Sequence, residues 1–254
     1  MMASVSRQLA TVEKASGRKT GTAARAVVVE ADQVSHNLAG QKLGRKGRDT
    51  RDRILVATTE LLAGPRSVPI SLSAVARQAS LGMTSLYNYF SDLTELLMAV
   101  LEPVMASAED AYLAMLRTRW ADEELGERCQ EFVAAYHAFW ARNSRLLHLR
   151  NSMTEENEGR MMVHRVKSTQ PIIRLIAQQM DGDSWQHRSP EFAMATTLMI
   201  GIERSITIST DRELPKLIAT DIQHDDQHFV RPSARLLELA IHDMRAQPKV
   251  QATA

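Results

Sequence analysis

The sequence predicts an all-α protein, with an N-terminal three-helix head that contains a helix-turn-helix, followed by a larger helical domain. Apolar residues recur at helical spacing along most of the 254 residues, and no alternating β-type run exceeds a few residues. Residues 71–90 have the pattern of a short amphipathic helix, a tight turn and a second short helix. Apolar residues make up 44% of the chain and charged residues 24%, as is typical of a mostly helical soluble protein.

Charge and composition divide the chain into three regions. Residues 1–53 contain eleven basic and five acidic residues, a net charge of +6, whereas the whole chain carries only +1. A basic front joined to an acidic remainder indicates an N-terminal end that faces nucleic acid. Residues 1–44 lack sustained periodicity, so we expect a flexible basic N-terminal arm. The head then spans 45–92, and the helical domain spans 93–254.

The head is expected to contain three helices. The first starts near Asp49 or Thr50 and ends at Gly64-Pro65, because glycine and proline stop a helix. Ser71 is a good N-cap for the second helix, since its hydroxyl can accept a free backbone N–H of the next turn. The residues expected to pack inside this unit are Ile54, Leu55, Thr58, Leu61, Leu62, Leu72, Val75, Ala76, Ala79, Leu81, Leu86 and Phe90.

A longer helical pattern follows the head and continues toward Arg119. Asp92 with Glu95 three residues later resembles a capping box. Pro103 lies inside the pattern and lacks a backbone donor, so we expect a kink or break near residues 99–103. Further helices are predicted near residues 124–142, 144–155, 159–180, 190–210 and 230–246.

The second helix of the helix-turn-helix predicts double-stranded DNA as a partner, because in this motif it enters the major groove. We assign base-edge contacts to Thr84, Ser85 and Asn88, and an asparagine can bond adenine through two hydrogen bonds. Hydroxyl and basic groups supply phosphate contacts, which position the protein on the duplex. The residues assigned to phosphate or minor-groove contacts are Ser71, Tyr87 and Tyr89, and an arm ahead of the first helix formed by Arg45, Lys46 and Arg48.

Three stretches in order resemble a known family. They are Arg-Asp-Arg-Ile-Leu-x-Ala at 51–57, Ser-Leu-Ser-Ala-Val-Ala-Arg-Gln-Ala-Ser-Leu at 71–81 and Ser-Leu-Tyr-Asn-Tyr-Phe-Ser at 85–91. Together they resemble the TetR family of bacterial transcriptional regulators, and the match is concentrated in residues 51–101. The resemblance implies a homodimer that binds a palindromic DNA operator, usually as a repressor. It also implies that a small ligand in the C-terminal helical domain releases the DNA.

The chain departs from the usual pattern of this family at three positions. Ser80 stands in the turn where glycine is common, so we expect slight strain or a different φ there. Leu93 stands where lysine is common, which removes one expected phosphate contact. Leu62 stands where phenylalanine is common.

Aromatic residues gather on one face of the expected helix 124–142, in a chain with only 5% aromatic residues. Plain core packing explains most aromatic stripes, but the resemblance favours a ligand cavity here. An apolar cavity predicts a small hydrophobic effector, such as an acyl, steroid-like or aromatic compound. The residues assigned to it are Met105, Phe132, Tyr136, Phe139, Trp140, Met153 and Met199.

A homodimer is expected through the helices near 190–210 and 230–246. The segment 191–209 is apolar nearly all round, and such a helix is buried on several sides, often by a partner subunit. Two recognition helices about one DNA turn apart are needed to bind a palindrome, which also favours a dimer.

Other functions have weaker support in the sequence. It contains no Gly-rich phosphate loop, Gly-x-Ser-x-Gly or zinc-type Cys/His set, so we expect neither catalytic residues nor a cofactor or metal. His224 and His228 lie in a polar connector, and Cys129 has no local catalytic partner. A DNA-binding activator, and a helical adaptor that uses the head for protein contacts, are the alternatives. A single cysteine and the lack of a long apolar run predict a cytoplasmic protein with no membrane span.

Overall fold

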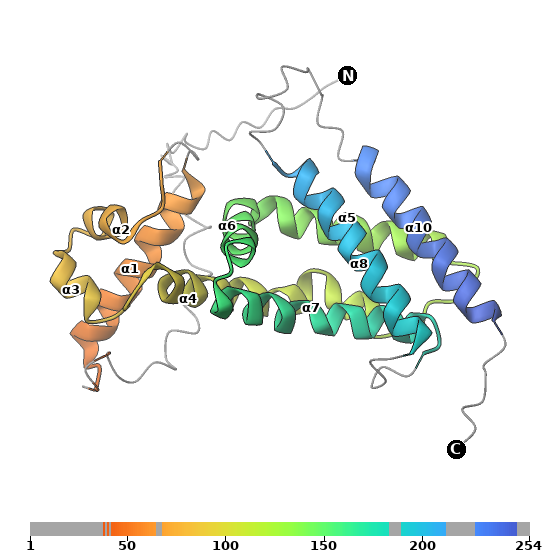
Figure 1. Ribbon diagram of the computed structural model, residues 1–254, viewed down its shortest axis with the longest axis horizontal. Coiled ribbons are helices and arrows are strands. Elements are labelled where there is room, and N and C mark those ends of the chain that lie inside the picture. Colours follow the sequence, from red (N-terminus) through yellow and green to blue (C-terminus); the bar gives the residue numbers. More distant parts are fainter. Residues whose placement is uncertain are drawn as a thin grey trace, which may run out of the picture.

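The computed structural model describes residues 38, 40, 42–64, 68–182, 189–211 and 227–247. The α-helices among them are α1 (Arg45–Ala63), α2 (Leu72–Gln78), α3 (Met83–Tyr87), α4 (Leu93–Ala106), α5 (Leu125–Arg142), α6 (Ser144–Glu155), α7 (Gly159–Gln179), α8 (Pro190–Ser209) and α10 (Gln227–Ala246). Figure 1 shows α1, α2 and α3 grouped at one end of the molecule, with α5, α8 and α10 toward the other end. The all-α prediction is confirmed for the described residues. We call α1–α3 the head and α5–α10 the body.

The head has its own apolar core. Val75 of α2 and Leu86 of α3 are fully buried, and they pack with Ile54 of α1 and with Phe90. Leu96, near the start of α4, closes this core from the side of the body. The burial of Leu86 and Phe90 follows the sequence prediction, because residues four apart lie on one face of a helix.

The first helix begins earlier than the sequence predicts. It starts at Arg45 with Gly44 as its N-cap, whereas Asp49 or Thr50 was the expected first residue. Leu43 is buried just before the helix, and apolar packing there holds the first turn in place without a capping side chain. The end agrees with the prediction, because the Gly64 backbone N–H donates to carbonyl oxygens of the last helical turn.

The connection between α2 and α3 is a tight turn with a left-handed residue. The Ser71 hydroxyl accepts the Ala74 backbone N–H at 3.2 Å, which confirms the predicted N-cap of α2. Ser80 has φ of +53°, a conformation that glycine adopts more readily than residues with a Cβ. Of the two expected alternatives, slight strain or a different φ, the structure agrees with slight strain, because the serine adopts the left-handed φ that glycine favours. The Leu81 backbone N–H donates to the Ala76 carbonyl at 2.8 Å and closes the turn.

Helix α4 joins the head to the body. The Asp92 carboxylate accepts the Glu95 backbone N–H at 2.8 Å, and the Glu95 carboxylate accepts the Ser91 backbone N–H at 2.7 Å, as in a capping box. Of the predicted kink or break at 99–103, the break is wrong, and the kink stays a prediction. The helix continues through Pro103 to Ala106, because proline clashes with only one upstream carbonyl and the α4 side chains are packed on both sides.

The helical pattern becomes irregular further along the chain than Pro103, where the sequence predicts a kink or break. A π-helical turn covers Glu109–Leu113, and a 3₁₀ turn covers Ala114–Leu116. The helical pattern therefore does not continue unbroken to Arg119. Within the π-helical turn, Tyr112 is buried against the aromatic side chains of α5.

The body has a second and larger core. α5 packs against α10, α7 packs against α8, and α6 packs against α7. Helix bounds agree with the predicted segments to within three residues at either end, and α6 spans the predicted residues 144–155. Core side chains such as Phe132, Trp140 and Leu147 are almost completely buried.

Two arginines connect the head with the body. The Arg145 guanidinium, on α6, donates to the backbone carbonyls of Leu61 at 2.6 Å and Gly64 at 3.0 Å, and also to that of Val68. Arg160, near the start of α7, forms an ion pair of 3.0 Å with Asp92, the N-cap of α4. The end of α1 and the start of α4 are thereby attached to the two helices that follow α5.

Candidate nucleic-acid interface and internal cavity

Helix α3 presents a polar face to solvent. Thr84, Ser85 and Asn88 are exposed, while Leu86 between them is buried in the head. Tyr87 is 49% exposed, which is high for a tyrosine in a small helical unit. The four side chains are exposed, and α3 lies at the end of the molecule away from α10 (Figure 1). They can form hydrogen bonds to a partner without disturbing the core of the head.

Basic side chains occupy the first turn of α1. Arg45, Lys46 and Arg48 are exposed and belong to the helix, so the prediction that they form an arm ahead of it is wrong. Their helical state follows from the earlier start of α1. The first turn contains no acidic residue, and cations near a helix N-terminus are disfavoured by the helix dipole. Their placement is therefore not explained by helix stability.

Two predicted contact residues have other roles in the structure. The Ser71 hydroxyl is the cap of α2 and lies 3.1 Å from the Ser73 hydroxyl, so it already has two partners. Tyr89 is half-buried against the core of the head, so its ring contributes to packing. Neither side chain is as accessible as the α3 residues.

The chain just before α1 lies against the same surface. The Leu38 backbone N–H donates to the Asn88 carbonyl at 3.1 Å, at the end of α3. Arg48 donates from Nη1 to the Leu43 carbonyl at 3.1 Å. Part of the region predicted as a flexible arm is thus attached to the head, whereas residues 1–37 lie outside the described residues.

A small cavity lies inside the body, next to α4 and the π-helical turn. The volume in which the centre of a water molecule fits is about 10 Å³, which is room for about one water. Pockets for drug-sized ligands measure roughly 300–1,000 Å³, so the described residues contain no ready-made cavity of that size here. The cavity is lined by Met105, Tyr112, Tyr136, Phe139, Trp140, Leu147, Arg150, Ser168, Thr169 and Ile172.

Four of the seven predicted ligand residues line this cavity: Met105, Tyr136, Phe139 and Trp140. The other three predictions are not supported. Phe132 is fully buried behind Tyr136, with the two rings stacked and their centroids 6.1 Å apart. Met153 and Met199 pack into the core elsewhere in the body. The apolar side chains along one face of a helix pack against more than one neighbouring helix. Only some of them can therefore line a given cavity.

The aromatic wall of the cavity is held by edge-to-face contacts. The Tyr112 ring lies 4.9 Å from the Tyr136 ring and 5.2 Å from the Phe139 ring, measured between centroids. Burial raises the pKa of Tyr112 and Tyr136 well above the usual value for a phenol. Both tyrosines are therefore neutral at physiological pH and provide hydroxyls rather than charges.

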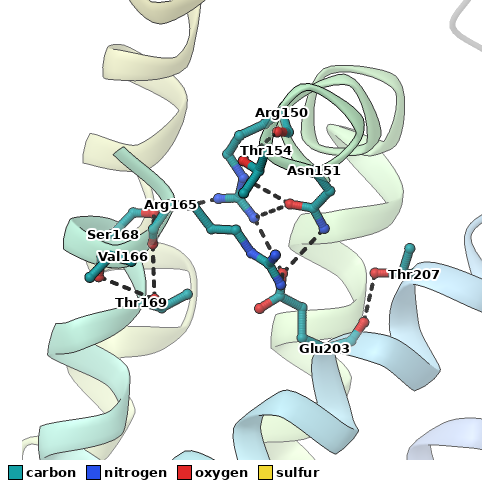
Figure 2. A network of polar contacts seen from close by, with 9 residues as sticks. All are labelled: Arg150, Asn151, Thr154, Arg165, Val166, Ser168, Thr169, Glu203 and Thr207. Carbon is teal, nitrogen blue, oxygen red and sulfur yellow. Dashed lines mark hydrogen bonds and ion pairs between the residues drawn. The ribbon is translucent and has the colours of Figure 1, made fainter. Parts of the chain in front are cut away.

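The opposite wall is polar and charged. Arg150 on α6 is only 2% exposed, and its guanidinium lies over the Trp140 ring, 5.6 Å from the centroid. It donates to Ser168 on α7 at 3.4 Å, and to Glu203 on α8 at 3.4 Å (Figure 2). Burial lowers the pKa of Arg150, and the nearby Glu203 carboxylate partly restores it. None of the residues of this polar wall is among the ligand-binding residues predicted from the sequence.

A signal for the polar wall was present in the sequence. Arg150 and Asn151 lie three and four residues after Leu147, on the same face of the amphipathic segment 144–155. Glu203 likewise interrupts the most apolar segment of the chain. Charged residues on an apolar helical face are rarely buried without a partner, so each one indicates a buried polar site.

Helices α8 and α10 expose apolar side chains to solvent. Ile200 is 64% exposed, and Leu236 and Leu239 are 60% and 48% exposed. Next to Ile200, Gly201 has no neighbouring atom within 4 Å of the position that a Cβ would occupy. α8 and α10 pack against each other, and Figure 1 shows them side by side. They therefore present an apolar face that includes a glycine.

The described residues contain little that resembles other kinds of site. Among them, no group of three or more His, Cys, Asp or Glu side chains is placed to hold a metal ion. His224 lies outside the described residues, and His228 at the start of α10 is exposed. Cys129 is fully buried, and burial raises its pKa to about 12. No helix in the described part of the chain has the length and hydropathy required to cross a membrane.

Comparison of the chain with protein-family models and with curated proteins finds no match.

Proposed function

We propose that the chain is a ligand-responsive transcriptional regulator of the TetR type, acting as a repressor. It would bind a palindromic operator as a homodimer and release it when a small effector binds in the body. The observation that carries this proposal is the exposed polar face of α3. Three hydrogen-bonding side chains and a tyrosine face solvent there, while Leu86 anchors the short helix in the core. Surface polarity of this kind suits a helix that enters the major groove.

Positive charge next to α3 supports DNA as the partner. The exposed first turn of α1 carries three cations, and backbone atoms before α1 contact the end of α3. Phosphate contacts by basic side chains provide affinity without sequence preference, and base-edge contacts by Asn88 and Thr84 provide selectivity. This division assigns separate roles to α1 and α3.

The apolar face of α8 and α10 supports a homodimer. Exposed Ile200, Leu236 and Leu239 lose contact with water if a second copy covers them. Gly201 in the same face permits close approach of a partner helix, whereas an exposed glycine in a monomeric helix costs about 1 kcal/mol relative to alanine. A symmetric dimer then places two heads on one duplex.

Two routes connect the cavity to the head, which supports regulation by a ligand. α4 contributes Met105 to the cavity and Leu96 to the core of the head. α6 contributes Arg150 to the cavity, and five residues earlier Arg145 binds the carbonyls at the end of α1. A ligand that enlarges the cavity by displacing α4 or α6 would transmit that movement to the head.

The experiment that tests this proposal is selection of bound duplexes from a random DNA pool at moderate salt. We expect an enriched palindrome whose half-sites are spaced for two recognition helices, about one helical turn apart. Enrichment of no sequence, or equal and salt-sensitive binding to every duplex, would contradict it. A variant with Thr84, Ser85 and Asn88 replaced by alanine serves as a control, because it alters the exposed face and leaves the core intact.

A further inference from the structure

The polar wall of the cavity carries more positive than negative charge. Arg150 and Arg165 both form ion pairs with the same atom, Oε1 of Glu203, at 3.4 Å and 3.2 Å. Figure 2 shows the two guanidinium groups reaching Glu203 from α6 and α7. Two cations share one carboxylate; Arg150 and Glu203 are buried, whereas the Arg165 side chain is 34% exposed, so Arg150 is the cation of the three groups that is shielded from water and lines the cavity.

Arg150 has only a long contact to its carboxylate partner, Glu203, at 3.4 Å. Strong bonds between a guanidinium and a carboxylate measure about 2.7–2.9 Å. Those from Arg150 measure 3.1 Å and 3.2 Å to the Asn151 side chain and 3.4 Å to Ser168 and to Glu203. A buried cation with long bonds gains free energy when an anion comes close to it.

The positive charge of Arg150 also affects a neighbouring histidine, His164. The His164 Nδ1 atom on α7 is buried and has no hydrogen-bond partner among the described residues. Burial lowers the pKa of His164, and the charge of Arg150 lowers it further, ahead of the opposing effect of Glu102.

The remaining lining completes a site for an anion with an apolar body. Ser168 and Thr169 lie in the lining with Arg150, and their hydroxyls donate to the Arg165 carbonyl of α7, so Arg150 is the charged donor of the site. Aromatic rings with Leu147 and Ile172 form the other surfaces. We propose that this cavity binds a small organic acid, with its carboxylate on Arg150 and its carbon body against the aromatic wall. The inference rests on the proposed function in treating this acid as the effector, and it replaces the purely hydrophobic ligand that the aromatic stripe predicts.

The bound acid must enlarge the cavity. The present space holds about one water, so side chains must move before even one benzene ring fits. Met105 is the most adaptable lining residue, because its side chain is unbranched and flexible, and it is only half-buried. Its displacement would act directly on α4.

Isothermal titration of the full-length protein with matched pairs of probes tests the inference without DNA. The probes are benzoate and benzamide, and phenylacetate and phenylacetamide, all at constant ionic strength. Each pair shares its ring and differs mainly in the charge of the polar group. We expect both acids to bind with Kd values about 10- to 100-fold lower than those of their amides, the range for a hydrogen-bonded charge. Equal binding within each pair, or no binding of either acid, would overturn the inference.

Two substitutions with opposite expected effects distinguish ligation from a structural role. Arg150→Met should weaken benzoate to the level of benzamide and leave benzamide unchanged. Glu203→Gln removes the competing carboxylate and should tighten benzoate by about tenfold. Arg128→Met is the charge-matched control, because Arg128 is exposed on α5 and its ion pairs among the described residues are with an α5 residue and the N-cap of α5. Parallel loss of acid and amide binding in Arg150→Met would contradict the assignment.

The result can be separated from the test of DNA binding. Preferred binding of acids without any enriched duplex would support the acid site and refute the regulator. An enriched palindrome with acids no better than amides would support the regulator and refute the acid site. If both hold, benzoate should release the enriched duplex from the wild-type protein but not from Arg150→Met.

Discussion

Replacing Arg145 by methionine should loosen the attachment of the head to the body. Methionine retains most of the aliphatic stem and removes the guanidinium that donates to three backbone carbonyls. Two of these bonds are partly buried and one is exposed. Counting the exposed bond as negligible and the other two at roughly 1 kcal/mol each gives a loss of about 2 kcal/mol in the free energy of unfolding. For a chain of this size that loss corresponds to a decrease of about 4–8 °C in Tm.

Differential scanning calorimetry measures this decrease, and hydrogen exchange locates it. Backbone amides in the last turn of α1, next to Leu61 and Gly64, should exchange faster in Arg145→Met, while those of α10 should not change. Arg128→Met is again the control, since exposed ion pairs are worth no more than about 1 kcal/mol. A Tm for Arg145→Met equal to that of the control or the wild type would refute the claim that Arg145 holds α1.

Three further predictions concern the turn, the DNA face and the dimer. Ser80→Gly should raise the free energy of unfolding by up to about 1 kcal/mol, because glycine adopts φ of +53° without strain; an unchanged or lower urea midpoint would contradict this. Asn88→Ala should lose about 1–3 kcal/mol of discrimination at one base pair of the enriched duplex. Arg48→Ala should instead weaken binding to all duplexes alike and reduce the slope of the log binding constant against log salt concentration by about one. Identical binding profiles for the two variants would contradict these roles. Ile200→Glu should weaken self-association by at least about tenfold, because it places a carboxylate among exposed apolar side chains. Analytical ultracentrifugation measures this, and an unchanged sedimentation profile would exclude α8 from the interface.

Local sequence signals were sufficient to predict most of the helices. α6 has the predicted bounds because the segment 144–155 is periodic between polar residues on either side. The start of α1 could not be predicted in this way. Its first turn holds cations that disfavour a helix N-terminus, and Leu43 packs against the head in a manner visible only in three dimensions. Tertiary packing, which the local sequence does not reveal, also explains why α4 continues through Pro103: the helix is packed on both sides.

The candidate sites were predictable to different degrees. The exposed residues of α3 follow from one short helix, where the positions of Leu86 and Phe90 determine which face is buried. The cavity required four helices and a π-helical turn to come together, and Tyr112 reaches it only through that turn. The sequence therefore indicated the aromatic side of the cavity on α5 but not the arginine that faces it.

The buried thiol provides an intrinsic reporter of the integrity of the body. Cys129 is the only cysteine in the chain, and it lies in the core of α5. With its pKa raised to about 12, only about one thiol in ten thousand is ionised at pH 8. Alkylating reagents can then modify the native protein only when the body opens. A change confined to the head leaves the thiol unreacted, so the rate of labelling separates loss of DNA contact from loss of the fold.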